Sequence, residues 1–257
     1  MDLDGKVFVV TGAGSGVGAA TAVALAARGA RVAVNFSRSA EGAAETVAAC
    51  EAAGGQAFAV RADVAVDGDC VALAQSALAR WGRIDGLVNN AGTTRFVPHH
   101  DLDGLSAADF DAIMRVNVSG TFQATRACVP ALRAAGGAVA IVSSSSALDG
   151  VGSSIAYAAS KGALNTMTLS LARALGPEIR VNAVCPGFVE TRWMRGGLGE
   201  ARYEPVRQAY CANAALQRTL SAEDVAETIL YLLGAPGLTG HIVRLDAGRA
   251  LGAPPAR

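Results

Sequence analysis

The chain has 257 residues, 51% of them apolar, with few aromatic side chains and abundant alanine and glycine. Its 22 lysines and arginines equal its 22 aspartates and glutamates, and no Lys/Arg-rich run or basic face points to a nucleic-acid partner. No apolar stretch approaches the length that crosses a bilayer, so we expect no membrane partner.

Short β-rich runs alternate with longer alanine-rich stretches, the pattern of repeated β-α-β units on a parallel sheet. Several short runs are entirely apolar, as strands covered on both faces should be. The expected strands are Lys6–Val10, Arg31–Asn35, Gln56–Arg61, Ile84–Asn89, Ala138–Ser143, Arg180–Val184 and His241–Leu245. The expected helices are Val17–Arg28, Glu41–Ala53, Gly68–Trp81, Ala107–Ala135, Ile155–Leu175 and Ala222–Leu233. No linker or repeat interrupts this order, so we expect one domain over residues 1–257.

The stretch from Gly187 to Leu220 is the exception, because it is irregular, contains glycine and mixes polar with apolar residues. It follows an expected strand, and open α/β sheets place their ligand contacts beyond the carboxyl ends of the strands. We therefore expect this stretch to contribute to a ligand site.

The start of the chain and its cysteines indicate a reducing compartment. Met1–Lys6 carries two aspartates and leads straight into an apolar run, without the basic region and cleavage site of a signal peptide. The five cysteines are scattered and lack CxxC spacing, which favours reduced thiols in a cytoplasmic protein. His99-His100-Asp101 invites a metal hypothesis, but adjacent loop residues rarely converge on one ion, so we expect no metal.

A glycine-rich turn joins the first expected strand to the first expected helix. It reads Thr11-Gly12-Ala13-Gly14-Ser15-Gly16-Val17-Gly18. Glycines permit the dihedrals of a tight turn and let a pyrophosphate reach the helix N-terminus with no Cβ in the way. The turn therefore predicts phosphate binding, with a purely structural turn as the alternative.

Tyr157 and Lys161 stand four residues apart in an expected helix, which places them on one face. A cation about 4 Å from a phenol, in an effective dielectric of about 20, favours the phenolate by roughly 4 kcal/mol, or about three pKa units. Such a phenol would suit general acid–base catalysis near neutral pH. A partly exposed surface pair is the alternative for these two residues alone.

These segments belong to a longer series of motifs. In chain order they are Thr11-Gly12-x-x-x-Gly16-x-Gly18, Asn89-Asn90-Ala91-Gly92, Asn117, Ser144, Tyr157-x-x-x-Lys161 and Pro186-Gly187. The series resembles the short-chain dehydrogenase/reductase family, in its 3-oxoacyl-carrier-protein reductase-like branch, from Lys6 to Gly248. The resemblance implies a single doubly wound α/β fold of the Rossmann type, with about seven parallel strands and helices on both faces. It also implies hydride transfer between NAD(P) and a carbonyl or secondary alcohol.

The resemblance assigns four catalytic residues. Tyr157 exchanges a proton with the substrate oxygen, while Lys161 binds the nicotinamide ribose and lowers the pKa of the phenol. Ser144 hydrogen-bonds the substrate oxygen, where negative charge develops. The run of serines from 143 to 146 leaves that assignment open by one position. Asn117 holds a water beside the lysine for proton relay, with an ordinary helix-interior amide as the alternative.

The resemblance also implies the cofactor contacts. Asn89 and Gly92 line the adenosine side, Asp63-Val64 surrounds the adenine, and the segment after Pro186 meets the nicotinamide. The full expected set is Gly12, Ser15, Gly16, Val17, Gly18, Ser37, Arg38, Asp63, Val64, Asn89, Ala91, Gly92, Tyr157, Lys161, Pro186, Gly187, Val189 and Thr191.

The end of the second expected strand favours NADP(H), with NAD(H) as the alternative. An NAD enzyme usually keeps a carboxylate there for the ribose 2′-hydroxyl, whereas an NADP enzyme supplies an arginine. This chain has no acid between Val34 and Glu41, and Ser37 with Arg38 suits a 2′-phosphate. Against this, Ser15 occupies a place in the glycine turn where many NADP-dependent relatives carry a basic residue.

By resemblance, the segment at about 188–215 is a substrate lid. Its aromatic side chains suggest an apolar substrate body, and its arginines suit an acidic carrier or acyl thioester, with a solvated helix face as the alternative. These residues are Phe188, Trp193, Tyr203 and Tyr210, with Arg192, Arg195, Arg202 and Arg207. We expect a small-molecule carbonyl or alcohol substrate, and a 3-oxoacyl thioester is the first to consider.

Alcohol, sugar and steroid dehydrogenases of the same family are alternative functions. A dinucleotide-binding regulator without catalysis is another, while an epimerase or dehydratase of the longer related branch fits the short chain less well. The resemblance also implies a homodimer or homotetramer formed through the helices that carry Asn117 and Tyr157.

Overall fold

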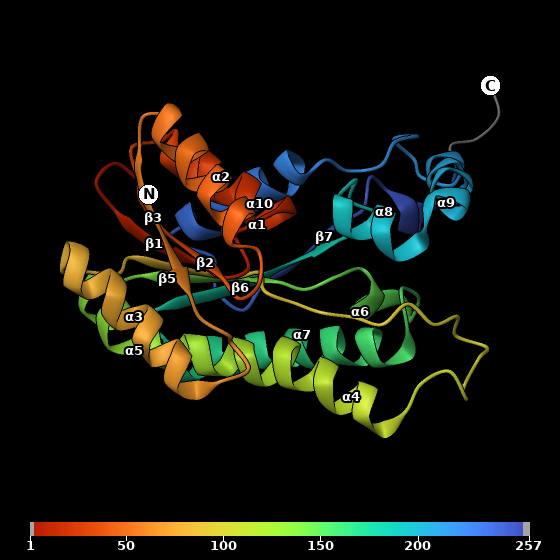
Figure 1. Cartoon of the computed structure of the whole chain (residues 1–257), viewed down its shortest axis with the longest axis horizontal. Helices are drawn as coiled ribbons and strands as arrows, with labels where there is room; N and C mark the ends of the chain where they lie inside the picture. Colours follow the sequence, from red (N-terminus) through yellow and green to blue (C-terminus); the bar gives the residue numbers. More distant parts are fainter. Residues whose placement is uncertain (1–2, 254–257) are drawn as a thin grey trace.

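The computed structural model describes residues 3–253, which are built around a seven-stranded parallel sheet (Figure 1). The strands are β1 (Val7–Val10), β2 (Arg31–Phe36), β3 (Gln56–Arg61), β4 (Gly86–Asn89), β5 (Ala138–Val142), β6 (Arg180–Pro186) and β7 (Ile242–Leu245), in the order β3-β2-β1-β4-β5-β6-β7. The ends of the predicted domain over 1–257, and the first two residues of Met1–Lys6, lie outside the described part. The doubly wound sheet predicted from the sequence is confirmed.

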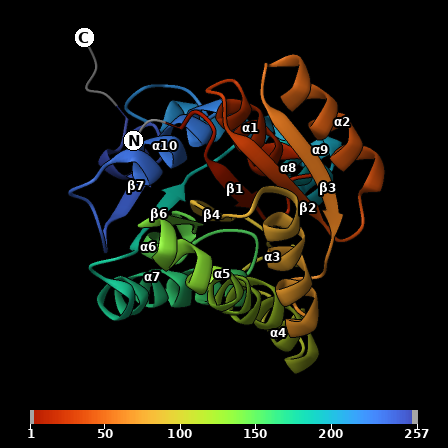
Figure 2. The same ribbon diagram turned by 90° about the vertical axis from the view of Figure 1, so that its left-hand side faces the viewer.

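Two layers of helices cover the sheet, with α1, α2 and α10 on one face and α3, α5 and α7 on the other (Figures 1 and 2). The α-helices are α1 (Gly16–Ala26), α2 (Ala40–Ala52), α3 (Asp67–Trp81), α4 (Ala107–Met114), α5 (Gly120–Ala135), α6 (Ser146–Asp149), α7 (Ile155–Leu175), α8 (Arg192–Leu198), α9 (Glu200–Ala212) and α10 (Ala222–Gly234). Two further turns are η1 (Arg115–Ser119), a π-helix, and η2 (Arg249–Leu251), a 3₁₀-helix. Within residues 3–253, none of these helices has the length and apolarity to cross a membrane.

The apolar strand runs form the core because both faces of the sheet are covered. Phe8 packs with Leu25 and Ile229 in the cluster beneath α1 and α10. Leu132 and Leu164 belong to the cluster on the opposite face. Burial of these side chains fixes the central strands and thereby holds the loops at their carboxyl ends.

The segment from Gly187 to Leu220 is more regular than the sequence predicts, because it contains α8 and α9. The Thr191 hydroxyl accepts a hydrogen bond from the Met194 N–H and caps α8. Glu204 and Arg207 form an ion pair at helical spacing on α9. These local signals outweigh the glycines that made the segment look irregular. Figure 1 shows both helices beyond the end of the sheet.

The helix predicted over Ala107–Ala135 is continuous in extent but changes its winding at η1. Asn117 lies at the centre of this π-helical turn and is fully buried. Single π turns inside longer helices often mark functional sites. The change in winding has no counterpart in the apolar spacing of the sequence, so the pattern alone could not predict it.

Side chains tie the loops after β1 and β4 together where the strand order reverses. The Thr11 hydroxyl accepts hydrogen bonds from the backbone N–H groups of Asn90 and Ala91. The Asn90 amide donates in turn to the carbonyl oxygens of Thr11 and Gly12, at 3.0 Å each. Such a switch point is where doubly wound sheets bind ligands.

Candidate active site

A cavity of about 840 Å³ opens at the carboxyl ends of the strands. Most of the predicted site residues line it, and they come from the loops after β1 to β6 together with α7. The predicted residues that line it are Gly12, Ser15, Gly16, Val17, Ser37, Arg38, Asp63, Val64, Ala91, Gly92, Ser144, Tyr157, Lys161, Pro186, Gly187, Val189 and Thr191. Gly18, Asn89 and Asn117 lie behind the lining.

The glycine turn has the backbone geometry that its sequence predicts. Gly12 and Gly16 have φ values of +61° and +56°, in the left-handed region that side chains with a Cβ rarely adopt. A Cβ on Gly18 would lie 2.6 Å from the Gly12 carbonyl oxygen, so this glycine lets α1 pack closely against the turn. Gly18 thus shapes the turn without lining the cavity. The turn presents its backbone and the N-terminus of α1, a suitable cradle for a pyrophosphate.

Asn89 does not face the cavity, contrary to the sequence prediction. Its amide is buried and donates to the Thr125 hydroxyl on α5 at 2.9 Å. Its neighbour Asn90, which the sequence analysis left without a role, lines the cavity instead. The alternation of side chains along a strand explains the exchange, because one of two adjacent residues at its end must point away. Gly92 lies near Asn117 and Lys161, since a Cβ on it would lie 3.5 Å from the Asn117 Oδ1 and 3.8 Å from the Lys161 Nζ.

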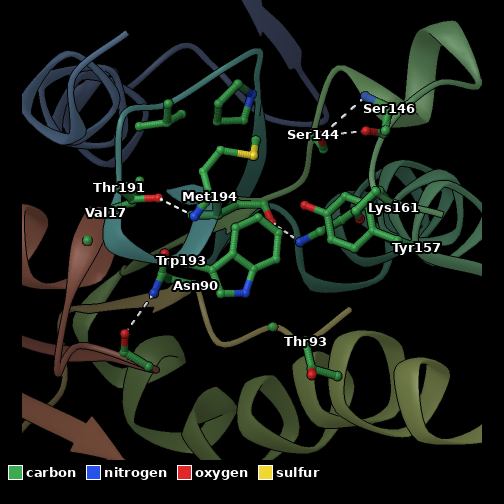
Figure 3. Close-up of a pocket in the computed structure, with 18 of the residues that line it drawn as sticks. Val17, Asn90, Thr93, Ser144, Ser146, Tyr157, Lys161, Thr191, Trp193 and Met194 are labelled. Carbon is green, nitrogen blue, oxygen red and sulfur yellow. Dashed lines mark hydrogen bonds between the residues drawn. The ribbon is translucent and has the colours of Figure 1, made fainter. Parts of the chain in front are cut away.

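Tyr157 and Lys161 lie together on α7, with the Lys161 Nζ 5.5 Å from the centroid of the Tyr157 ring (Figure 3). The ammonium donates to the Val142 carbonyl oxygen at 2.8 Å. Burial raises the pKa of Tyr157 to about 12, although a hydrogen bond with Ser144 opposes the shift. Burial also lowers the pKa of Lys161 to about 8. Desolvation is the largest influence on the pKa of the phenol, and the role of Lys161 in lowering that pKa stays a prediction.

The serine run resolves into distinct positions. Ser144 lowers the pKa of the Tyr157 phenol, while the Ser143 hydroxyl donates to the Lys161 carbonyl oxygen at 3.1 Å. The Ser144 Oγ also donates to the Ser146 Oγ at 3.0 Å and accepts from the Ser146 N–H at 3.1 Å (Figure 3). Ser144 is thus the serine of this run that influences the pKa of Tyr157.

Asn117 connects the loop after β4 to the Tyr157 helix. Its Oδ1 accepts from the Thr93 N–H at 2.7 Å, and its Nδ2 donates to the Thr93 carbonyl oxygen and to the Ser160 hydroxyl. The Ser160 hydroxyl donates to the Tyr157 carbonyl oxygen. The buried amide therefore positions the wall of the cavity on either side of Lys161.

Polar side chains from the end of β2 and the loop after it line the cavity, among them Asn35, Ser37 and Arg38. Asn35, at the end of β2, is buried, and its Oδ1 accepts from the Gly12 N–H at 3.2 Å. Its Nδ2 donates to the carbonyl oxygens of Val60 and Ala62. Arg38 is exposed at the cavity rim and has no ion-pair partner within residues 3–253.

Comparisons with known proteins agree with this architecture. The family model described as enoyl-(acyl carrier protein) reductase matches residues 12–250. A ketoacyl reductase of the granaticin polyketide synthase of Streptomyces violaceoruber is 41% identical over 249 residues, which cover 96% of this chain and 97% of that protein. The 3-oxoacyl-[acyl-carrier-protein] reductase of a Synechocystis species is 34% identical, with 97% and 98% covered. A solved short-chain dehydrogenase/reductase from Burkholderia xenovorans has a TM-score of 0.90 and 41% identity, with 96% of this chain and 99% of that chain covered.

The chain belongs to the short-chain dehydrogenase/reductase family. It is therefore an oxidoreductase that acts on a carbonyl or alcohol with NAD(P). In this short-chain dehydrogenase/reductase, sequence reasoning missed the roles of Asn90 and Ser146, and it missed Phe96, which also lines the cavity. Asn90 could have been found from the sequence, because adjacent residues at a strand end point in opposite directions and Asn89 is followed by a second asparagine. Phe96 lies in a loop whose sequence carries no comparable pattern.

Proposed function

We propose that the protein reduces the ketone of a 3-oxoacyl thioester or a related carbonyl compound, with NADP(H) as its cofactor. The observation that carries this proposal is that Ser144 and Tyr157 line the cavity together, beside the buried Lys161. Two hydroxyl donors that converge on one point suit a carbonyl oxygen, where negative charge develops as the carbon is reduced. The names of the ketoacyl and 3-oxoacyl reductase relatives support the same reaction.

In this proposal Tyr157, Ser144 and Lys161 control proton transfer to the substrate oxygen. With a pKa of about 12, Tyr157 is protonated at neutral pH and donates its proton to that oxygen. The Ser144 hydroxyl, which donates to Ser146 in the structure, would turn to donate a second hydrogen bond to the substrate oxygen, and the Lys161 ammonium would stabilise the phenolate that remains. Asn117, with an associated water, would lie on the route by which Tyr157 regains a proton. The bound nicotinamide would supply the hydride.

The cofactor fits the residues present. Gly12 and Gly16 leave room at the N-terminus of α1 for a pyrophosphate, and Asp63-Val64 lines the cavity where the adenine would lie. Lys161 would hold the nicotinamide ribose, and Pro186, Gly187, Val189 and Thr191 would meet the nicotinamide. For the 2′-phosphate, Ser37 and Arg38 would supply hydrogen bonds and charge.

In this proposal the segment at about 188–215 acts as a substrate lid, and the whole chain is a single catalytic domain. The side chains that the segment contributes to the cavity support this role. Met194 and Leu198 on α8 line the cavity, as do Val206 and Tyr210 on α9. Arg192 and Arg202 also line it, whereas Arg195 and Arg207 are ion-paired with glutamates. The first pair is thus placed to meet an anionic part of the substrate, and the second pair supports the solvated-face alternative.

A spectrophotometric assay tests the proposal. NADPH oxidation is followed with acetoacetyl-CoA, a simple ketone and crotonyl-CoA, whose thioester carries a double bond in place of the ketone. We expect turnover with the first and none with the third. Turnover of the simple ketone alone would favour an alcohol, sugar or steroid dehydrogenase. Tight NADPH binding with no turnover of any carbonyl or alcohol would indicate the non-catalytic regulator.

We also propose that the protein forms a homodimer or homotetramer through α5 and α7. Phe122 on α5 and Leu169 on α7 are 43% and 45% exposed, although both are large and apolar. A second copy that packs against these helices would remove them from water. Light scattering coupled to size exclusion would give the mass of the assembly, and a monomer would overturn the proposal.

A further inference from the structure

The substrate end of the cavity has an aromatic wall formed by Phe96 and Trp193 beside Tyr157. The centroids of the Phe96 and Trp193 rings lie 5.4 Å apart with a tilt of 57°. Those of Trp193 and Tyr157 lie 6.1 Å apart with a tilt of 43°. Figure 3 shows the Trp193 indole reaching from α8 toward the proton donor. Both separations fall within the range of attractive ring contacts.

The local backbone holds this wall in place. The Thr191 cap fixes the first turn of α8, two residues before Trp193. A Cβ on Gly197 would overlap the Phe96 ring, so glycine at this position allows Phe96 to lie against α8. Contacts near both ends of the seven-residue helix α8 therefore hold the aromatic wall in place.

Trp193 nevertheless remains 45% exposed, although it lines the cavity. Apolar side chains that also line the cavity include Val97, Pro98 and Val151. A ligand with an apolar face that packs against this indole would bury more of its surface. A planar ring gains more from this contact than a flexible chain, because ring stacking adds to simple area burial and a rigid ligand loses less conformational entropy.

We propose that the substrate carries its carbonyl in a ring fused to a planar aromatic ring, and that the aromatic ring packs against Trp193 and Phe96. Because the Trp193 ring lies close to the Tyr157 ring, the carbonyl and the aromatic ring of the substrate must also lie close together. A carbonyl oxygen that accepts hydrogen bonds from Tyr157 and Ser144 lies within about one ring width of the indole. A benzo-fused cyclic ketone meets both requirements at once. This inference rests on the proposed function and narrows its substrate class.

Two ketones with the same carbon skeleton test the inference. In 2-tetralone one of the two fused rings is aromatic, whereas in trans-2-decalone both are saturated. The measurement is the ratio of kcat/KM for 2-tetralone to that for trans-2-decalone, with NADPH, in the wild type and in Trp193→Leu. The two ketones differ in intrinsic reactivity, but this difference affects the ratio equally in both proteins. A change in the ratio between the wild type and Trp193→Leu therefore measures the contribution of the indole. We expect the ratio to fall about twofold to tenfold in Trp193→Leu, as loss of one aromatic contact predicts.

Two further variants serve as controls. Trp193→Phe keeps an aromatic face and should retain most of the preference. Trp81→Phe alters a tryptophan that packs against Phe58, away from the cavity lining, and should leave the ratio unchanged. An identical ratio in the wild type and Trp193→Leu would overturn the inference.

Failure of the inference is distinguishable from failure of the proposed function. Turnover of acetoacetyl-CoA with no effect of Trp193→Leu on the ratio would leave carbonyl reduction intact and remove only the aromatic substrate class. If no carbonyl is reduced, titration calorimetry can still compare how tightly the protein saturated with NADPH binds the two ketones. Tighter binding of 2-tetralone than of trans-2-decalone, lost in Trp193→Leu, would support the aromatic site, and equal binding in both proteins would overturn it.

Discussion

The Tyr157 phenol and the Lys161 ammonium lie side by side in a poorly solvated part of the cavity, and this environment opposes both charged forms. Burial raises the pKa of the phenol to about 12 and lowers the pKa of the ammonium to about 8. Tyr157 is therefore a proton donor at neutral pH. In the oxidation direction the phenolate must form, so that reaction should be favoured at high pH.

Tyr157→Phe removes the proposed proton donor and keeps the ring. Turnover should fall by about 10²-fold to 10⁴-fold, the usual contribution of a general acid. NADPH binding should persist, because the proposed ribose contact belongs to Lys161. Initial rates and NADPH fluorescence titration measure the two effects. Tyr231→Phe is a matched control, since Tyr231 is 63% exposed on α10. Full turnover in Tyr157→Phe would contradict the assignment.

NADPH affinity should depend on pH through Lys161. If the ammonium donates to the ribose, the cofactor binds the protonated form best. The pKa of Lys161 is about 8 in the free protein, so affinity is fully present below pH 8 and is lost as the pH rises through that value. Dissociation constants between pH 7 and 9.5 should increase in the wild type. Lys161→Ala should bind weakly and show no such dependence. A wild-type constant that stays flat over this range would exclude the ribose role.

Arg38→Ala tests the proposed NADP preference. Loss of a charge-assisted hydrogen bond should reduce kcat/KM for NADPH by about 10-fold to 100-fold, while kcat/KM for NADH stays near the wild-type value. Arg28→Ala is the matched control, because Arg28 pairs with Glu227 and does not line the cavity. Equal losses with both cofactors would show that Arg38 does not recognise the 2′-phosphate.

At the scale of elements, the turn from β5 to α6 separates serines that the sequence cannot tell apart. The Ser144 hydroxyl donates to the Ser146 hydroxyl, and Ser144 lowers the pKa of Tyr157. The Ser145 N–H donates to the Pro186 carbonyl oxygen, and its hydroxyl has no hydrogen-bond partner in the described part of the chain. Only the three-dimensional turn decides which hydroxyl faces the phenol.

Ser144→Ala should therefore lower kcat by about 10²-fold to 10³-fold, the usual effect of removing one donor to a developing oxyanion. Ser145→Ala should stay near the wild-type rate, because its backbone hydrogen bond survives the substitution. The two variants are compared by NADPH oxidation at saturating substrate. Similar losses in both would assign the effect to the turn as a whole and not to the Ser144 hydroxyl.

Sequence patterns predict those elements whose periodicity follows from burial. Strands such as β1 and β5 were predictable because they are fully buried apolar runs between helices, and the glycine turn because a left-handed backbone selects glycine. Helices α8 and α9 were missed, since their stability depends on a threonine cap and ion pairs within a segment of mixed polarity. The raised pKa of Tyr157 could not be predicted either, because spacing fixes the neighbour of a phenol and says nothing of its burial.

At the scale of the whole molecule, the cavity is built from both halves of the sheet. Gly12 and Arg38 follow β1 and β2, while Ser144 and Pro186 follow β5 and end β6. Asn90 bonds across the reversal point and joins the two halves. A dinucleotide that spans the cavity would contact both, so its binding free energy should stabilise the fold as a unit.

Thermal unfolding should therefore report cofactor choice without any substrate. A ligand at 100 times its dissociation constant adds about 2.7 kcal/mol, and a domain of this size gains roughly 2–4 °C per kcal/mol, so NADPH should raise Tm by about 5–10 °C. NADH at the same concentration, if bound about thirtyfold more weakly, should raise Tm by only about 2–3 °C. Scanning calorimetry at one protein concentration compares the two Tm increases. In Arg38→Ala, the Tm increases with NADPH and with NADH should become similar. Equal shifts in the wild type would rule out the NADP preference, and no shift with either cofactor would contradict binding across the two halves.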